Sequence, residues 1–142
     1  MGSLVAYLSM TSKKFPVSQL SSVFCLAGPL EESPQLFSGD LTSIIKKITS
    51  AYQPHIWNEV LHINFHGGPR DQLVDENLAN FARFGNLSYA LDIKSTELRN
   101  VFQAMDHNSL FYYKHFWDTA APLMTQIMLA SSDSPRKKME IA

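Results

Sequence analysis

EVLHINFHGG, residues 59–68, decides how the rest of the chain is interpreted, because it places two histidines four positions apart in front of a glycine pair. Apolar and polar residues alternate along it, which predicts a strand with its apolar face inward and its polar face toward solvent. The two faces are Leu61, Ile63 and Phe65, and Val60, His62, Asn64 and His66. A helix is the alternative, with Ile56, Trp57, Val60, Leu61 and Asn64 on one stripe.

The two histidines make different sites in the two conformations. On a helix, His62 and His66 share a face and can bind one zinc ion. On a strand, four residues span roughly 13 Å, too far for one ion whose bonds to nitrogen are about 2 Å long. The strand therefore predicts no metal site, and a His-based metal hydrolase around His62, His66 and Asp71 is only a lesser alternative.

The glycine pair suggests two further sites. His66-Gly67-Gly68 resembles the glycine-rich oxyanion loop of lipases and esterases, a resemblance that implies ester hydrolysis. Those enzymes also need a G-x-S-x-G nucleophile elbow, and the sequence contains none, so a plain Gly-Gly-Pro turn is favoured. Because a helix is predicted to follow, its first amides and Arg70 form a weak candidate anion site.

Periodicity along the rest of the chain predicts more helices than strands. The expected helices cover residues 20–27, 40–52, 73–82, 95–105 and 109–130, with breaks at Pro54 and Pro122. The expected strands cover residues 4–11, 60–66 and 87–93, with 111–117 as a possible fourth. Residues 30–39 form the predicted loop, and Gly85 is expected to end the third helix in a left-handed conformation.

These elements predict an α+β fold, in which a small sheet of three to four strands is covered by helices and the C-terminal half is helix-rich. An all-α bundle is the alternative if the short strands are wrong. A single globular domain is expected over residues 1–130, followed by a polar, partly disordered tail over residues 131–142.

Composition narrows the function. The net charge of −1 argues against a general polyanion binder. The single cysteine, Cys25, excludes an internal disulfide and a Cys-rich zinc site, which favours an intracellular, cytoplasmic location. No apolar run is long enough to span a membrane. Asp106 and Asn108 begin a pattern like an EF-hand, but its later ligand positions are apolar, so neither a metal nor a cofactor is predicted.

The aromatic segment FYYKHFW, residues 111–117, carries the leading functional hypothesis. So many aromatic residues around one helix predict burial on several sides, within the domain or against a partner. We therefore expect a non-enzymatic protein-interaction or structural-assembly domain that binds a protein partner or a second copy of itself. The candidate contact residues are Phe111, Tyr112, Tyr113, Phe116 and Trp117.

A nucleic-acid-binding structural protein, similar in role to a nucleocapsid or coat protein, is the alternative function. Aromatic residues interleaved with Lys114 and His115 are typical of stacking platforms for single strands. Arg70, Arg83 and Arg99, together with the basic run 135–138, are the weak candidates for phosphate contacts. Nucleic acid is a less favoured partner than protein because the overall charge is not basic.

Overall fold

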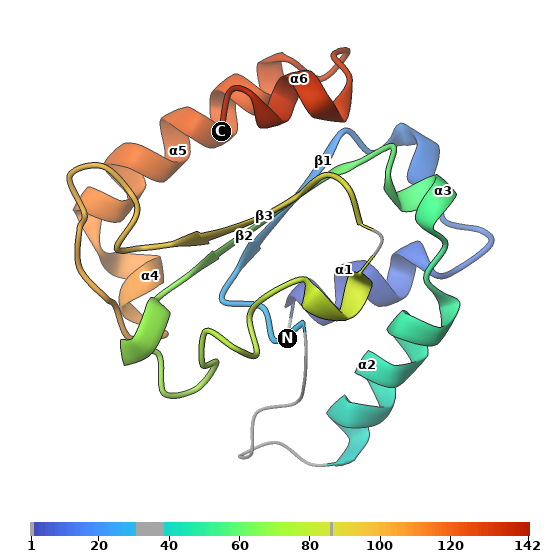
Figure 1. Cartoon of the computed structure of the whole chain (residues 1–142), viewed down its shortest axis with the longest axis horizontal. Coiled ribbons are helices and arrows are strands. Elements are labelled where there is room, and N and C mark those ends of the chain that lie inside the picture. Colours follow the sequence, from blue (N-terminus) through green and yellow to red (C-terminus); the bar gives the residue numbers. More distant parts are fainter. Residues whose placement is uncertain (1, 31–38, 86) are drawn as a thin grey trace.

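The chain forms a three-stranded parallel sheet covered by helices on both faces (Figure 1), in a computed structural model that describes residues 2–30, 39–85 and 87–142. The strands are β1 (Ser22–Leu26), β2 (Leu61–His66) and β3 (Ala90–Lys94), in the order β1-β2-β3. Phe24 pairs with Ile63, and Ile63 pairs with Leu91, so β2 is the central strand. The predicted α+β fold with a small helix-covered sheet is confirmed.

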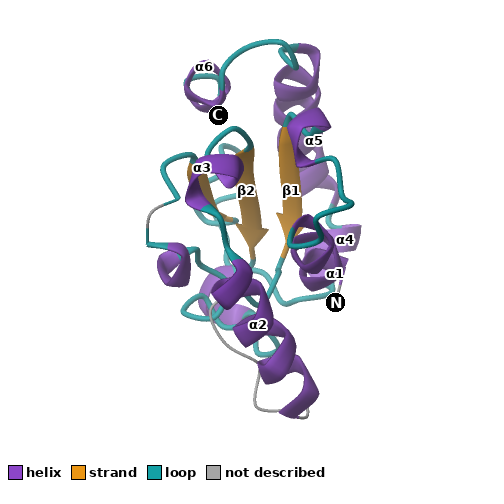
Figure 2. Ribbon diagram, turned by 90° about the vertical axis from the view of Figure 1, so that its right-hand side faces the viewer, coloured by secondary structure: helices purple, strands orange, loops and turns teal. Residues whose placement is uncertain are grey.

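The helices lie on both sides of this sheet. They are α1 (Gly2–Met10), α2 (Gly39–Ala51), α3 (Pro54–Trp57), α4 (Ser109–Tyr112), α5 (Lys114–Leu129) and α6 (Pro135–Met139). Short 3₁₀ turns are η1 (Val17–Gln19), η2 (Gly68–Arg70) and η3 (Ala82–Phe84). Helices α1 and α2 cover one face of the sheet, and α5 covers the other (Figures 1 and 2).

The strand predicted from EVLHINFHGG is confirmed as β2, but the prediction that its polar face meets solvent is wrong. All six of its residues are buried. The face formed by Leu61, Ile63 and Phe65 packs in one core cluster with residues of α5. Because a central parallel strand is covered by helices on both sides, His62 and His66 are buried as well.

His62 is accommodated in the core by two hydrogen bonds. Its Nδ1 lies 3.0 Å from the hydroxyl of Tyr7, and its Nε2 lies 3.1 Å from the carbonyl oxygen of Trp57. A carbonyl can only accept, so Nε2 carries the proton and Nδ1 accepts from Tyr7. Burial lowers the pKa of His62 to about 4, although the bond to Trp57 acts in the opposite direction. His62 is therefore a neutral structural residue that joins α1, α3 and β2.

Replacing His62 with glutamine should make the free energy of unfolding depend less on pH between about pH 6.5 and 4. As pH falls through this window, the unfolded chain takes up a proton on His62 while the folded chain does not. The wild type should therefore lose roughly 3 kcal/mol of unfolding free energy that the variant does not lose. Urea denaturation at several pH values measures the slope.

His55, which is exposed on α3, provides the control for this experiment. The His55→Gln protein should keep the wild-type slope. If the His62→Gln and wild-type proteins lose stability in parallel below neutral pH, the neutral buried state of His62 is refuted.

Both predictions for the N-terminal segments are wrong, because a helix forms where a strand was expected and a strand forms where a helix was expected. Residues 4–11 were expected as a strand, but α1 occupies Gly2–Met10, with Leu4, Tyr7 and Met10 buried at three-residue spacing. Residues 20–27 were expected as a helix, but they contain β1. Short apolar runs fit both the helical period and the strand period. The burial available on the two faces of the sheet then decides which element forms.

The helix expected over residues 73–82 does not form, because local side chains bind the backbone amides that a helix would use. Asp71 accepts from the amides of Leu73 and Val74, and Asp75 accepts from that of Asn77. Such turns compete with helix formation. Only η3 forms afterwards, and Gly85 has φ −49°, so the predicted left-handed helix end is also wrong.

The helix expected over residues 95–105 is likewise absent. Asn100 and Phe102 adopt positive φ angles of 67° and 47°, which an α-helix does not allow. The hydroxyl of Ser95 donates to the carbonyl oxygen of Gln103 at 2.8 Å and so folds the segment back on itself. The result is a loop that returns to the end of β2.

The other helix predictions agree with the structure. Helix α2 follows the expected face, and Pro54 begins α3. The helix expected over 109–130 is present as α4 and α5, but it breaks at Tyr113 and contains Pro122 inside α5, so the alternative strand over 111–117 is wrong. Residues 31–38 of the predicted loop lie outside the described residues.

The division into a domain over 1–130 and a tail over 131–142 remains a prediction. Within that tail, residues Pro135–Met139 form α6, and Lys138 is buried. In the described ranges 2–30, 39–85 and 87–142, no helix is both long and apolar enough to cross a membrane.

Candidate functional site

The carboxyl ends of the three parallel strands lie at one edge of the sheet and pass into turns that hydrogen-bond one another. Ala27, after β1, donates its amide to the carbonyl oxygen of Phe65 at 2.7 Å. Ser95, after β3, donates its amide to the carbonyl oxygen of His66 at 2.9 Å. In open parallel sheets, ligands bind at the carboxyl ends of the strands, so this edge is the place where a site is expected.

Gly67 is the centre of this edge. Its carbonyl oxygen accepts from the amide of Met105 at 2.8 Å and from the hydroxyl of Ser95 at 3.1 Å. A Cβ at position 67 would overlap the carbonyl oxygen of Met105, so the close approach of these two backbone segments requires glycine. The contact brings residues 105–107 beside the end of β2.

The approach of these segments places Asp71 against His107. The Oδ2 atom of Asp71 lies 3.0 Å from Nδ1 of His107. The Oδ1 atom accepts from the amides of Leu73 at 3.0 Å and Val74 at 2.8 Å, so the carboxylate is fixed in place. Asp71 is 1% exposed, whereas His107 is partly exposed. A carboxylate accepts, so Nδ1 carries the proton and Nε2 is the ring nitrogen left for a ligand or water.

This histidine lines an open cleft of about 550 Å³. Its other walls are Pro69, Arg70, Gln72, Leu73, Asp106 and Asn108. Arg70 is exposed, and no described residue forms an ion pair or hydrogen bond with its guanidinium. The cleft therefore combines an oriented imidazole with a cation and two amide side chains.

His66 lies behind this cleft and not in it. The residue is 1% exposed, and its Nδ1 has no hydrogen-bond partner among the described residues. Burial is the main cause that lowers the pKa of His66, and the positive charge of Lys94 acts in the same direction. Nearby carboxylates, including Asp71, oppose the shift without reversing it. His66 is a neutral residue beneath the site.

The structure separates the residues of the metal-hydrolase hypothesis. Asp71 pairs with His107, while His62 binds Tyr7 and Trp57. Within residues 2–30, 39–85 and 87–142, no group of three or more His, Cys, Asp or Glu side chains is placed to hold a metal ion. Sequence reasoning missed His107, and the available signal was its position between Asp106 and Asn108, two polar residues after a buried Met105.

The arginine candidates do not form one anion site. Arg70 lines the cleft and belongs to the three-residue turn η2, so no helix start supplies amides beside it, and its role as an anion contact remains a prediction. Arg83 lies on η3, and Arg99 lies in the loop between β3 and α4. Neither of these two lines the cleft around His107.

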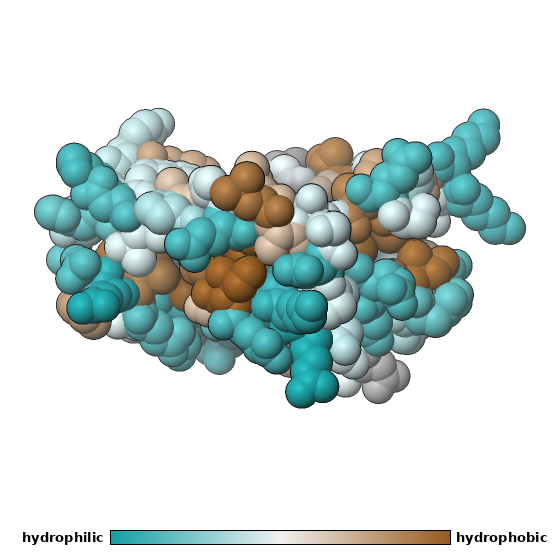
Figure 3. Space-filling model, turned by 90° about the horizontal axis from the view of Figure 1, so that it is seen from above, coloured by the Kyte–Doolittle hydropathy of each residue, from teal (hydrophilic) through white to brown (hydrophobic). Residues whose placement is uncertain are grey.

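The aromatic candidates are divided between core and surface. Phe116 is fully buried against Phe65, with ring centroids 5.7 Å apart, and so lies inside the domain. Tyr113 and Trp117 are partly buried, while Phe111 and Tyr112 are exposed. Over the face seen in Figure 3, apolar side chains form small separate patches between hydrophilic ones.

Cys25 offers no nucleophile for this site. It is buried within β1, and burial raises the pKa of its thiol to about 12, so the thiolate is not formed at neutral pH. Ser95 is also buried, and its hydroxyl donates to backbone carbonyl oxygens. Among the described residues, Asp71 is the one hydrogen-bond partner of the His107 ring.

The chain is an α/β domain with a parallel sheet, and at the carboxyl edge of that sheet an aspartate orients a histidine. The comparison with known families also gives an α/β domain. A family model described as the PGAP1-like alpha/beta domain matches residues 1–127, and the chain therefore belongs to that family. No curated protein matches the sequence at a significant level.

This membership corrects the functional prediction. The family has a hydrolase-like α/β fold, so the prediction of a non-enzymatic interaction or structural-assembly domain is wrong. The structural and oligomerisation roles expected from the aromatic segment are withdrawn for the same reason. One departure from hydrolases of the lipase and esterase type remains, because the 142 residues contain no G-x-S-x-G elbow.

Proposed function

We propose that this domain hydrolyses carboxylic esters at the cleft beside His107, with water as the nucleophile. The observation that carries the proposal is the hydrogen bond between Asp71 and Nδ1 of His107, 3.0 Å long, at the carboxyl edge of a parallel sheet. Membership of a hydrolase-like family supports the reaction class. The missing nucleophile elbow favours direct attack by water over attack by an elbow serine.

In this mechanism, His107 acts as the general base. Its Nε2 removes a proton from a water molecule in the cleft while the water oxygen attacks the ester carbonyl. Asp71 holds the ring in the tautomer that leaves Nε2 unprotonated, and it stabilises the imidazolium that forms. The proton then passes from Nε2 to the departing alkoxide, which leaves as the alcohol. The products are one carboxylic acid and one alcohol.

Arg70 gives the cleft a preference for anionic substrates. Its guanidinium lines the same walls as His107 and has no described carboxylate partner, so it is available to a phosphate of the substrate. The related family activity is that of a GPI inositol deacylase. We therefore propose an acyl ester of an inositol phospholipid as the substrate class, with the phosphate near Arg70 and the ester near His107.

The test compares a neutral short-chain ester with an acylated inositol phosphate, using the full chain and measuring the acid released. Hydrolysis of both above the background rate of buffer is expected. If neither ester is hydrolysed faster than in buffer, or if a His107→Gln protein hydrolyses both esters at the wild-type rate, the proposal fails.

Replacing Arg70 with glutamine should raise KM for the phosphate-bearing ester about tenfold, because a charge-assisted hydrogen bond contributes roughly 1.5–3 kcal/mol. KM for the neutral ester should stay the same. The Arg99→Gln protein is the matched control, since Arg99 is exposed and lies outside the cleft. Equal KM changes for the two esters would contradict the phosphate role.

A further inference from the structure

A second group of reactive side chains lies at the opposite edge of the sheet, where the strands begin. Lys138 of α6 is only 2% exposed. Its Nζ lies 2.9 Å from the hydroxyl oxygen of Ser21 and 3.2 Å from the carbonyl oxygen of the same residue. Ser21 immediately precedes β1, so a residue 117 positions away in sequence is brought directly onto it.

The lysine is buried, and the described residues provide no counter-ion for it. An ammonium has three N–H donors, but the described residues offer its Nζ only the two oxygen atoms of Ser21. No described carboxylate lies within ion-pair distance of it. Burial lowers the pKa of Lys138, and the more distant charge of Asp133 acts in the opposite direction. An amine in this position loses its proton more readily than an exposed lysine does.

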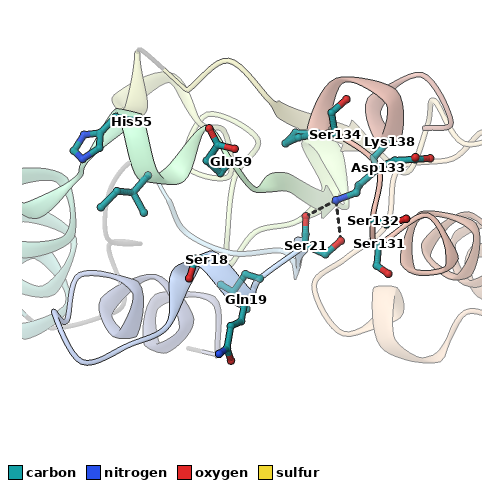
Figure 4. Close-up of a pocket in the computed structure, with 13 residues that line it drawn as sticks. Ser18, Gln19, Ser21, His55, Glu59, Ser131, Ser132, Asp133, Ser134 and Lys138 are labelled. Atoms are coloured by element: carbon teal, nitrogen blue, oxygen red, sulfur yellow. Dashed lines mark hydrogen bonds between the residues drawn. The ribbon is translucent and has the colours of Figure 1, made fainter.

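The pair opens into a cavity of about 850 Å³ between η1, α3 and the segment that connects α5 with α6 (Figure 4). Ser21 is half-buried and lines this cavity together with Lys138. The remaining polar walls include Ser131 and Ser134, with His55 and Glu59 on the far side. A small electrophile can therefore reach the hydroxyl oxygen of Ser21 from solvent.

We propose that Ser21 is a second nucleophile and Lys138 its general base, forming a Ser–Lys dyad that accepts acyl groups from esters. A hydroxyl bound to a neutral amine is one of the known arrangements for acyl transfer. This dyad is separate from the His107 cleft, and its test does not depend on the proposed function.

After Lys138 has lost a proton to solvent, its amine takes the proton of the Ser21 hydroxyl while the oxygen forms a bond to the ester carbonyl carbon. The carbon–oxygen bond to the leaving alkoxide then breaks, and the ammonium of Lys138 returns the proton to that alkoxide, giving the alcohol. Water hydrolyses the acyl-serine by the same proton route and releases the carboxylic acid, which restores the hydroxyl and the amine.

Covalent labelling of the full chain tests the dyad. In the reaction with a fluorophosphonate probe, the Ser21 oxygen forms a bond to phosphorus, the phosphorus–fluorine bond breaks, and the proton passes to Lys138. Peptide mass spectrometry should find the adduct on Ser21, and the Ser21→Ala protein should lose it. The Ser9→Ala protein, altered on α1 outside the cavity, should be labelled like the wild type.

The Lys138→Met protein tests whether Lys138 acts as a base or only supports the structure, because methionine keeps the apolar stem of the side chain and removes the amine. Labelling of Ser21 should slow by about 10²–10⁴-fold, the usual contribution of general base catalysis. The pH dependence of Ser21 labelling in the wild-type protein gives a second measurement, which does not require a variant to fold. The titratable groups that face the cavity are Lys138, His55, Glu59 and Asp133.

The labelling rate should rise with loss of a proton from a group whose pKa lies below that of an ordinary lysine. An absence of adduct on Ser21, a rate independent of pH, or full labelling of a folded Lys138→Met protein would each overturn the dyad.

Discussion

In a Ser21→Ala background, which removes the second proposed ester site, the His107→Gln substitution should slow hydrolysis of the neutral ester about 10²–10⁴-fold, measured as kcat/KM. Glutamine still fills the site and can donate a hydrogen bond to Asp71, but it cannot take a proton from water. The loss should appear mainly in kcat, because the walls of the cleft that bind the substrate are unchanged. Steady-state release of the acid at saturating and subsaturating ester measures both parameters.

The matched control for this variant is His115→Gln. His115 is exposed on α5 and lies outside the cleft, so its replacement should leave kcat/KM at the wild-type value. Thermal unfolding of both variants should follow the wild type, since His107 is partly exposed and contributes one side-chain hydrogen bond. If the His107→Gln substitution leaves more than half of the kcat/KM of the Ser21→Ala parent, His107 has no part in the reaction.

Replacing Gly67 with alanine should destabilise the fold by about 3 kcal/mol, near the upper end of the usual effect of overpacking. The added Cβ would meet the carbonyl carbon and oxygen of Met105, and neither backbone segment can move without breaking the hydrogen bonds that join them. Because His107 follows Met105 by two residues, the same displacement should separate its ring from Asp71. Urea denaturation measures the stability, and ester hydrolysis should fall in parallel.

Gly85→Ala is the control for the glycine substitution. Gly85 has φ −49°, and a Cβ there would lie 3.9 Å from the carbonyl oxygen of Ala82, an ordinary contact. The substitution should therefore leave stability unchanged or raise it by about 0.4–1 kcal/mol through the unfolded state. If the Gly67→Ala protein is as stable and active as Gly85→Ala, the close approach of residues 67 and 105 does not support the site.

The sequence predicts the central strand, helix α2 and the long C-terminal helix because the apolar residues in these segments recur at a regular spacing over several residues. The prediction fails at residues 4–11 and 20–27, because short apolar runs fit both the helical and the strand period and only the tertiary fold determines which element forms. It fails again at residues 73–82, where the spacing of apolar residues suggests a helix but aspartate and asparagine side chains bind the backbone first. Burial of His62 follows from the parallel pairing of the strands, which no local pattern reveals.

The candidate site was harder to predict than the fold. Asp71 was considered with His62 and His66, and the structure instead pairs it with His107, which is 36 positions away. That pairing depends on Gly67 and Met105 lying against each other, a contact between two loops with no shared sequence signature. The resemblance of His66-Gly67-Gly68 to an oxyanion loop is in line with the hydrolase-like family that matches the chain, but it was set aside because the nucleophile elbow is missing.

The protonation state of the His107 ring in solution tests the central claim most directly, because the mechanism requires a bare Nε2 facing the cleft. Nitrogen-15 NMR of the imidazole distinguishes the two neutral tautomers. The account predicts that wild-type His107 carries its proton on Nδ1, beside Asp71, and that an Asp71→Asn protein shifts the population toward the Nε2 tautomer. A wild-type ring protonated mainly on Nε2 would contradict the account, since no base would then face the water or the ester.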